Sequence, residues 1–129
     1  MNILLLEDDL VLAMHVREGL ENEGWTVFHE VNARSAKVTL EEEQVDFVIC
    51  DILIREVDNS ISKEGGLTLI DFVKFNLTPC PPIFVITGAS PKLNLVQLAE
   101  QMNVDRVFEK PVDIEDLVFE VRELLEAKR

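Results

Sequence analysis

The chain has 129 residues, 47% of them hydrophobic, and a formal net charge of −13. This length and composition indicate one folded domain with its own core rather than a disordered chain. No apolar run is long enough to span a bilayer, and the acidic balance disfavours direct binding to nucleic acid or to an anionic membrane. The start of the chain lacks the basic leader of a secretory signal, and Cys50 and Cys80 form no close pair. We therefore expect reduced thiols and a cytoplasmic protein.

Short apolar runs alternate with longer amphipathic segments along the whole chain. In chain order we predict a strand over Asn2–Leu6, a helix over Leu10–Glu23, a strand over Thr26–Val31, a helix after an Asn32 cap, a strand over Asp46–Cys50, a helix after Gly65-Gly66, a strand over Ile83–Ile86, a helix opened by Ser90 and Pro91, a strand over Arg106–Phe108 and a helix from Asp113. Apolar residues at helical spacing mark the inward faces of these helices, as in Ile114, Leu117, Val118, Val121, Leu124 and Leu125 of the last one.

This alternation predicts an α/β fold. Right-handed crossovers between parallel strands place helices on both faces of an open sheet, and near-continuous apolar strands fit a sheet that is buried on both sides. Ligands of such sheets bind outside the carboxyl ends of the strands. The residues that follow each strand are therefore the candidates for a binding site.

Polar residues follow four of the five predicted strands. Glu7-Asp8-Asp9 follows the first, Asp51 the third and Thr87 the fourth, and Lys110-Pro111 comes after the fifth. If the strand order is 2-1-3-4-5, two or three carboxylates, a hydroxyl and an ammonium meet at one edge. Clustered carboxylates repel one another unless a hard cation neutralises them, and oxygen ligands suit Mg²⁺ or Mn²⁺. A carboxylate can also attack phosphorus as a nucleophile.

Each of these residues also has an ordinary structural explanation. Asp8 and Asp9 could cap the helix that starts near Leu10, Asp51 could be a turn residue, and Lys110 could be an exposed lysine. His15 and His29 have no second ligand at metal spacing, so we expect no functional role for them. The coincidence of all four segments, each after an apolar run, favours a shared site.

The ordered set Asp8-Asp9, Asp51, Thr87-Gly88 and Lys110-Pro111 resembles the response-regulator receiver domain of two-component signalling over essentially the whole chain. The resemblance implies a flavodoxin-like (βα)5 fold with a parallel sheet in the order 2-1-3-4-5. It also implies a phosphorylation-dependent switch that is not a conventional enzyme. The phosphoryl group would come from a histidine kinase, a phosphotransfer protein or a small phosphodonor with Mg²⁺.

The resemblance also implies roles for individual residues. Asp51 would be the phosphoacceptor, assisted by Thr87 and Lys110, and Pro111 would follow a cis peptide bond. Asp9 would bind the metal directly and Asp8 mostly through water. The backbone carbonyl of Leu53 would complete the protein's metal ligands, and the small Gly88 would leave room for the phosphoryl group.

The sequence departs from the family pattern at several positions. Val107 stands where many receivers carry a switch aromatic, and the neighbouring Phe108 should face the other way on a strand. The segment 52–64 is longer than usual, and we hypothesise either that it modulates access and partner choice or that it is a tolerated insertion. The apolar Leu53 and Ala89 cannot orient water, which predicts slow autodephosphorylation.

Because the chain ends soon after the last helix, we expect a single receiver domain over residues 1–129, without an attached output domain, that signals through protein contacts. Phe119, Leu93 and Val96 lie off the inward faces of the fifth and fourth helices, so we expect a homodimer or target surface there. Two rival functions remain. One is an interaction module that works without phosphorylation, and the other is a metal-dependent phosphohydrolase.

Overall fold

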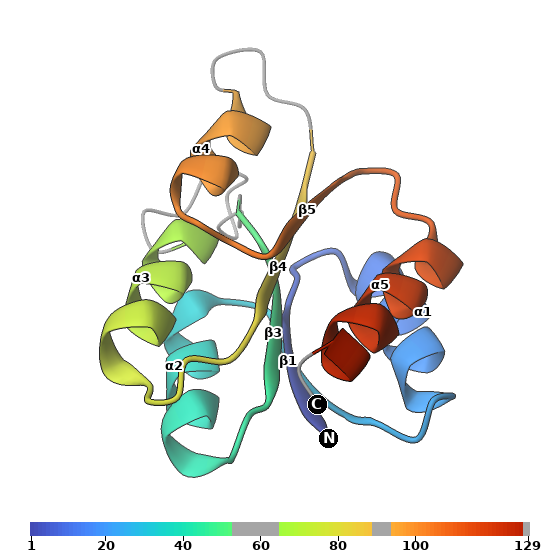
Figure 1. Cartoon of the computed structure of the whole chain (residues 1–129), viewed down its shortest axis with the longest axis horizontal. Coiled ribbons are helices and arrows are strands. Elements are labelled where there is room, and N and C mark those ends of the chain that lie inside the picture. Colours follow the sequence, from blue (N-terminus) through green and yellow to red (C-terminus); the bar gives the residue numbers. More distant parts are fainter. Residues whose placement is uncertain (53–64, 89–93, 128–129) are drawn as a thin grey trace.

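The computed structural model describes residues 1–52, 65–88 and 94–127. Helices and strands alternate along these residues (Figure 1): β1 Asn2–Leu6, α1 Leu10–Glu21, β2 Thr26–Glu30, α2 Ala33–Glu42, β3 Phe47–Asp51, α3 Gly66–Asn76, β4 Ile83–Thr87, α4 Leu95–Gln101, β5 Arg106–Glu109 and α5 Ile114–Ala127. The strands form one parallel sheet in the order β2-β1-β3-β4-β5. The predicted flavodoxin-like fold is confirmed.

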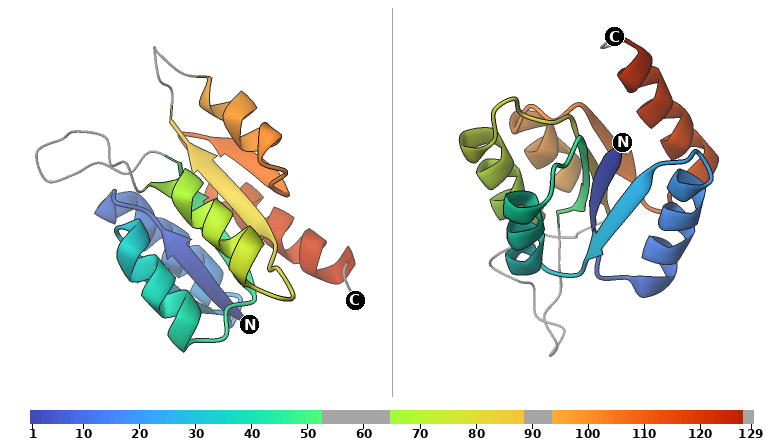
Figure 2. Two further views of the ribbon diagram at one scale, coloured as in Figure 1. Left: turned by 90° about the vertical axis from the view of Figure 1, so that its left-hand side faces the viewer. Right: turned by 90° about the horizontal axis from the view of Figure 1, so that it is seen from below.

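The helices cover the two faces of the sheet. In Figures 1 and 2, α2, α3 and α4 lie on one face, and α1 and α5 lie on the other. Side chains alternate accordingly along β1, because Leu4 and Leu6 pack into the core under α2 and α3 whereas Ile3 and Leu5 pack under α1 and α5. The three inner strands β1, β3 and β4 are almost wholly buried, as their apolar runs predicted.

Side-chain caps begin several helices as expected. Asn32 Oδ1 accepts the amide of Ser35 at 2.8 Å, and Asp113 Oδ1 accepts that of Asp116 at 3.1 Å. The fourth helix differs from the prediction. It begins at Leu95, with Asn94 Oδ1 accepting the amide of Gln97 at 3.0 Å, whereas the expected Ser90 and Pro91 lie outside the described residues.

The first helix is shorter than predicted, since α1 ends at Glu21 and not at Glu23. Gly24 then adopts a positive φ of 88°, a conformation that favours glycine, and the chain enters β2. No helix among the described residues combines the length and the apolar composition that a bilayer crossing demands.

Candidate functional site

The carboxyl ends of four strands meet at one edge of the sheet. Glu7 follows β1, Asp51 ends β3, Thr87 ends β4, and Lys110 follows β5. Strand pairing sets Asp51 opposite Ile86, and the Lys110 amide donates to the Thr87 carbonyl at 2.8 Å. The parallel register therefore brings together residues that lie more than a hundred positions apart in the sequence.

Lys110 is the central cation of this edge. Its Nζ donates to Asp51 Oδ2 at 2.7 Å and also lies 2.7 Å from Glu7 Oε1. Burial lowers the pKa of Lys110, but the two acids outweigh it and raise the pKa above its usual 10.5. The ammonium therefore stays protonated and neutralises part of the surrounding negative charge. The Lys110-Pro111 peptide bond is cis, as the resemblance implied.

Among these residues, Glu7 has the least favourable electrostatic surroundings. Its side chain is 1% exposed, and neither of its carboxyl oxygens accepts a hydrogen bond of good geometry from the residues that the structure describes. Burial, and then the adjacent Asp51, raise its pKa from 4.5 to about 8 against the opposing effect of Lys110. Among the described residues, Lys110 pairs with this carboxyl, and its charge does not cancel the effects of burial and of Asp51.

Three acids could hold a cation together. Glu7, Asp8 and Asp51 each offer one carboxylate oxygen, and these oxygens lie within 4.8 Å of one another. All donors are oxygens, and the buried oxygens of Glu7 lack good hydrogen bonds within the described part of the chain. This donor set fits a hard divalent ion such as Mg²⁺.

Asp9 lies outside this group. Its Oδ1 accepts the amides of Val11 and Leu12 at 3.1 Å each, so it caps α1, and its side chain is exposed. The capping alternative is therefore confirmed for Asp9, while Glu7 occupies the place in the cluster that we had expected for Asp9. The end of the apolar run at Leu6 is the sequence feature that favours Glu7, because the first acid after a buried strand lies closest to the sheet.

Thr87 is buried at the end of β4, where its hydroxyl donates a long hydrogen bond of 3.3 Å to the Gly88 carbonyl. Among the described residues, a Cβ atom built on Gly88 would meet only Lys110 Cδ, at 3.9 Å. Leu53, the expected metal ligand, and Ala89, expected to slow dephosphorylation, lie outside the described residues, as do residues 53–64 of the long segment 52–64.

Gly66 contributes to the site in a way that the sequence did not reveal. A Cβ atom at this position would lie 2.1 Å from the carbonyl oxygen of Asp51 and 2.8 Å from Ile52 Cα. Only glycine allows α3 to start against the end of β3, and the Gly66 amide donates to the Ile52 carbonyl at 3.1 Å. The end of β3 that carries Asp51 is therefore packed closely against the start of α3.

Val107, Phe108 and His29 lie near the site or in the core beside it. Phe108 packs against Phe84 in the core under α1 and α5, with ring centroids 5.4 Å apart, whereas Val107 packs on the other face. The predicted opposite orientation of Val107 and Phe108 is confirmed. His29, for which we expected no role, places Nε2 2.8 Å from the Glu7 carbonyl oxygen and so supports the backbone of the site.

The fold and the acidic edge define a flavodoxin-like α/β protein with a polar site at the carboxyl ends of its strands. The chain matches the family model of the response regulator receiver domain over residues 3–122 and belongs to that family. It is 28% identical to the transcriptional regulatory protein CrdR of Helicobacter pylori, over 89% of this chain and 50% of CrdR. It is 24% identical to TorR of Escherichia coli K12, the TorCAD operon transcriptional regulatory protein, over 96% of this chain and 50% of TorR.

Solved structures share the fold. A CheY-like receiver domain protein from Methanospirillum hungatei superimposes with a TM-score of 0.79 at 23% identity, covering 98% of this chain and 94% of that one. The receiver domain of NtrX from Brucella abortus superimposes with a TM-score of 0.81 at 23% identity, covering 96% and 98%. The chain spans about half the length of the curated relatives it matches.

Proposed function

We propose that this receiver domain is a phosphorylation-dependent signalling switch in which Asp51 accepts the phosphoryl group. The observation that carries the proposal is the position of Lys110 Nζ, 2.7 Å from both Asp51 and Glu7, beside three clustered carboxylates. Phosphoryl transfer needs mainly positioning and neutralisation of charge, which a fixed ammonium and an acidic cation site supply.

The transfer is a displacement at phosphorus. A carboxylate oxygen of Asp51 forms a bond to phosphorus while the bond between phosphorus and the donor's nitrogen or oxygen breaks, and the donor keeps that electron pair. Lys110 would then hold one phosphoryl oxygen. Thr87 would exchange its long hydrogen bond to the Gly88 carbonyl for one to a second phosphoryl oxygen.

The proposed metal is Mg²⁺, with Mn²⁺ as an alternative. Glu7, Asp8 and Asp51 would hold it together with the backbone carbonyl of Leu53, and Glu7 replaces Asp9 in this set because Asp9 caps α1. When bound, the ion supplies positive charge that offsets the charge of the phosphoryl oxygens. The ion would also offset the repulsion between the carboxylates of Glu7 and Asp51.

The donor would be a histidine kinase, a phosphotransfer protein or a small phosphodonor. Three exposed apolar residues at the start of α1, Leu10, Val11 and Met14, lie just after the acidic group and give a protein donor a surface to bind. The predicted slow autodephosphorylation depends on Leu53 and Ala89. We also propose that signalling occurs in the cytoplasm through protein contacts.

The expected contact surface on the last two helices has partial support. Phe119 is 50% exposed on α5, and Val96 is half-buried on α4, while Leu93 lies outside the described residues. Phe119 could therefore contribute to a homodimer or to a target interface. Replacing it by a charged residue should weaken such an association.

Intact mass spectrometry tests the proposal. Incubation with Mg²⁺ and acetyl phosphate should add a single phosphate to the wild-type chain and none to Asp51→Asn, which keeps the size of the side chain but removes the nucleophilic carboxylate. Absence of an adduct in the wild type would favour a module that works without phosphorylation. Rapid turnover of phosphate esters would favour a phosphohydrolase.

A further inference from the structure

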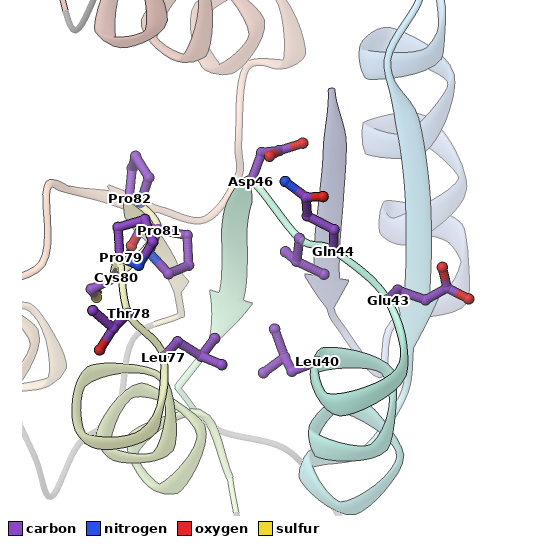
Figure 3. Close-up of a pocket in the computed structure, with 11 residues that line it drawn as sticks. Leu40, Glu43, Gln44, Asp46, Leu77, Thr78, Pro79, Cys80, Pro81 and Pro82 are labelled. Carbon is purple, nitrogen blue, oxygen red and sulfur yellow. Dashed lines mark hydrogen bonds between the residues drawn. The ribbon is translucent and has the colours of Figure 1, made fainter.

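A pocket lies at the amino edge of the sheet, away from the acidic group. It encloses about 570 Å³ between the ends of α2 and α3 and the segments that enter β3 and β4. Its lining comprises Leu40, Glu43, Gln44, Val45, Asp46, Leu77, Thr78, Pro79, Cys80, Pro81 and Pro82. Figure 3 shows Leu40 and Leu77 on facing sides of the space, with the proline residues gathered along one wall. Such walls fit an apolar side chain.

The electrostatic surroundings of this pocket are negative. Its lining includes Glu43 and Leu77, the C-cap residues of α2 and α3, so the negative ends of two helix dipoles converge there. The α2 helix has no basic residue in its last turn and runs into three exposed glutamates, Glu41–Glu43. Lys74, the basic residue in the last turn of α3, donates to the Asn103 carbonyl at 2.9 Å. The helix ends therefore attract an external cation.

We propose that this pocket docks a basic segment of a partner protein. An apolar side chain of that segment would enter between Leu40 and Leu77, and flanking lysine or arginine residues would lie over the ends of α2 and α3. A second copy of this chain fits less well, because two chains of net charge −13 repel each other. An acidic or uncharged partner would leave the helix ends without a counter-charge.

Docking at this pocket does not rest on the proposed phosphorylation. The described residues that line the pocket include none of the acids at the carboxyl edge, and Lys110 and Thr87 are also absent from them. Binding should therefore keep the same affinity, within about twofold, with and without Mg²⁺ and acetyl phosphate. A failed phosphorylation experiment would leave this proposal standing, and the reverse also holds.

A nuclear magnetic resonance titration tests it with a defined probe. The ¹⁵N-labelled chain is titrated at constant ionic strength with a synthetic hexapeptide, Lys-Leu-Lys-Lys-Leu-Lys, that combines basic and apolar residues. We expect saturable shifts at the amides of Leu40, Gln44, Leu77 and Cys80. Peptides with alanine in place of leucine, or glutamate in place of lysine, should produce much smaller shifts at these positions.

Two changes in the chain locate the binding. Glu43→Lys should weaken binding about fivefold, whereas Glu18→Lys, the same charge change on an exposed position of α1, should alter it less than about twofold. N-ethylmaleimide should react with the exposed Cys80 rather than with the buried Cys50, and its bulk should then block the pocket. Cys80→Ser treated with the same reagent should keep its affinity.

Several results would overturn the proposal. These are the absence of saturable shifts, shifts that map to the acidic edge instead, equal binding of the glutamate peptide, and undiminished binding after modification of Cys80. Concentration-dependent shifts at the pocket without any peptide would identify a second copy of the chain as the occupant.

Discussion

Carboxylates at the two edges of the sheet have opposite surroundings. At the amino edge, Asp46 Oδ2 accepts the amide of Asn2 and Asp105 Oδ2 accepts the amide of Ile83, both at 2.8 Å. Each of these acids satisfies a backbone group where a strand begins. At the carboxyl edge, Glu7 is buried beside Asp51, and its carboxyl group lies 2.7 Å from the Lys110 ammonium without accepting a backbone amide from the described residues.

The difference shows that unfavourable interactions between charged groups are concentrated at the carboxyl edge of the sheet. A carboxylate that accepts a backbone amide stabilises the strand end, and the same group buried beside other acids costs free energy until a cation arrives. Natural sequences keep such costly groups mainly where function needs them. The contrast predicts that mutations at the two edges change stability with opposite signs.

The largest expected effect tests the packing of the carboxyl edge. Gly66→Ala would set a methyl group 2.1 Å from the Asp51 carbonyl oxygen, so the start of α3 must move away from β3. We expect the free energy of unfolding to fall by about 2–3 kcal/mol, measured by urea denaturation. Gly88→Ala is the control, because within the described part of the chain its new Cβ meets only Lys110 Cδ at 3.9 Å, and it should change stability by less than about 0.5 kcal/mol.

The second prediction compares acids at the two edges in the metal-free protein. Asp46→Ala removes the acceptor of the Asn2 amide and should lower the free energy of unfolding by about 1–2 kcal/mol. Above about pH 8, where Glu7 is ionised in the folded chain, Glu7→Gln removes a buried charge next to Asp51 and should raise the free energy of unfolding by about 1 kcal/mol in EDTA. A loss of stability in Glu7→Gln as large as that in Asp46→Ala would show that the two edges do not differ.

The pH dependence sharpens the same comparison. The pKa of Glu7 rises from 4.5 to about 8 on folding because of burial and the nearby Asp51, so the folded chain binds a proton that the unfolded chain releases between these values. This contribution to stability is complete below about pH 4.5 and is lost as the pH rises towards 8. In thermal or urea denaturation without metal, the stability of Glu7→Gln should lack this contribution and its dependence on pH. Mg²⁺ should stabilise the wild type more than this variant.

The sequence was sufficient for the fold and for most of the site. Apolar runs buried on both faces identify parallel strands, and strand order then brings Asp51, Thr87 and Lys110 together. The sequence was not sufficient to tell which of the three consecutive acids, Glu7, Asp8 and Asp9, join Asp51 in the acidic cluster. The choice between Glu7 and Asp9 depends on where β1 stops and α1 starts. By residue type alone, an aspartate that caps a helix cannot be distinguished from one that binds a metal.

Other features depend on contacts that no local pattern encodes. Both Ser90 and Asn94 are capping residues by type, and the structure begins α4 after Asn94. The closeness of Gly66 to Asp51 follows from how α3 packs on β3, which the Gly65-Gly66 pair alone did not indicate. The pocket at the amino edge likewise needs two helix ends and two loops to meet.

The smallest expected effect concerns the two thiols, one beside each edge. Cys50 precedes Asp51 in the central strand β3 and is fully buried, and burial together with the Asp51 charge raises its pKa. Cys80 is exposed in the segment before β4. With a disulfide reagent at about pH 8, we expect Cys80 to react more than about 100-fold faster, and Cys80→Ser to lose the fast phase.

The slow reaction of Cys50 is informative in itself. Because β3 pairs with both β1 and β4, its thiol should become accessible only when the sheet opens, so urea should accelerate labelling in step with global unfolding. If Cys50 reacted quickly without denaturant, the end of β3 would open locally while the rest of the sheet stayed folded. Asp51 would then be held less firmly than its contacts with Lys110 and Gly66 imply, and the acidic edge would be mobile rather than fixed in advance of cation binding.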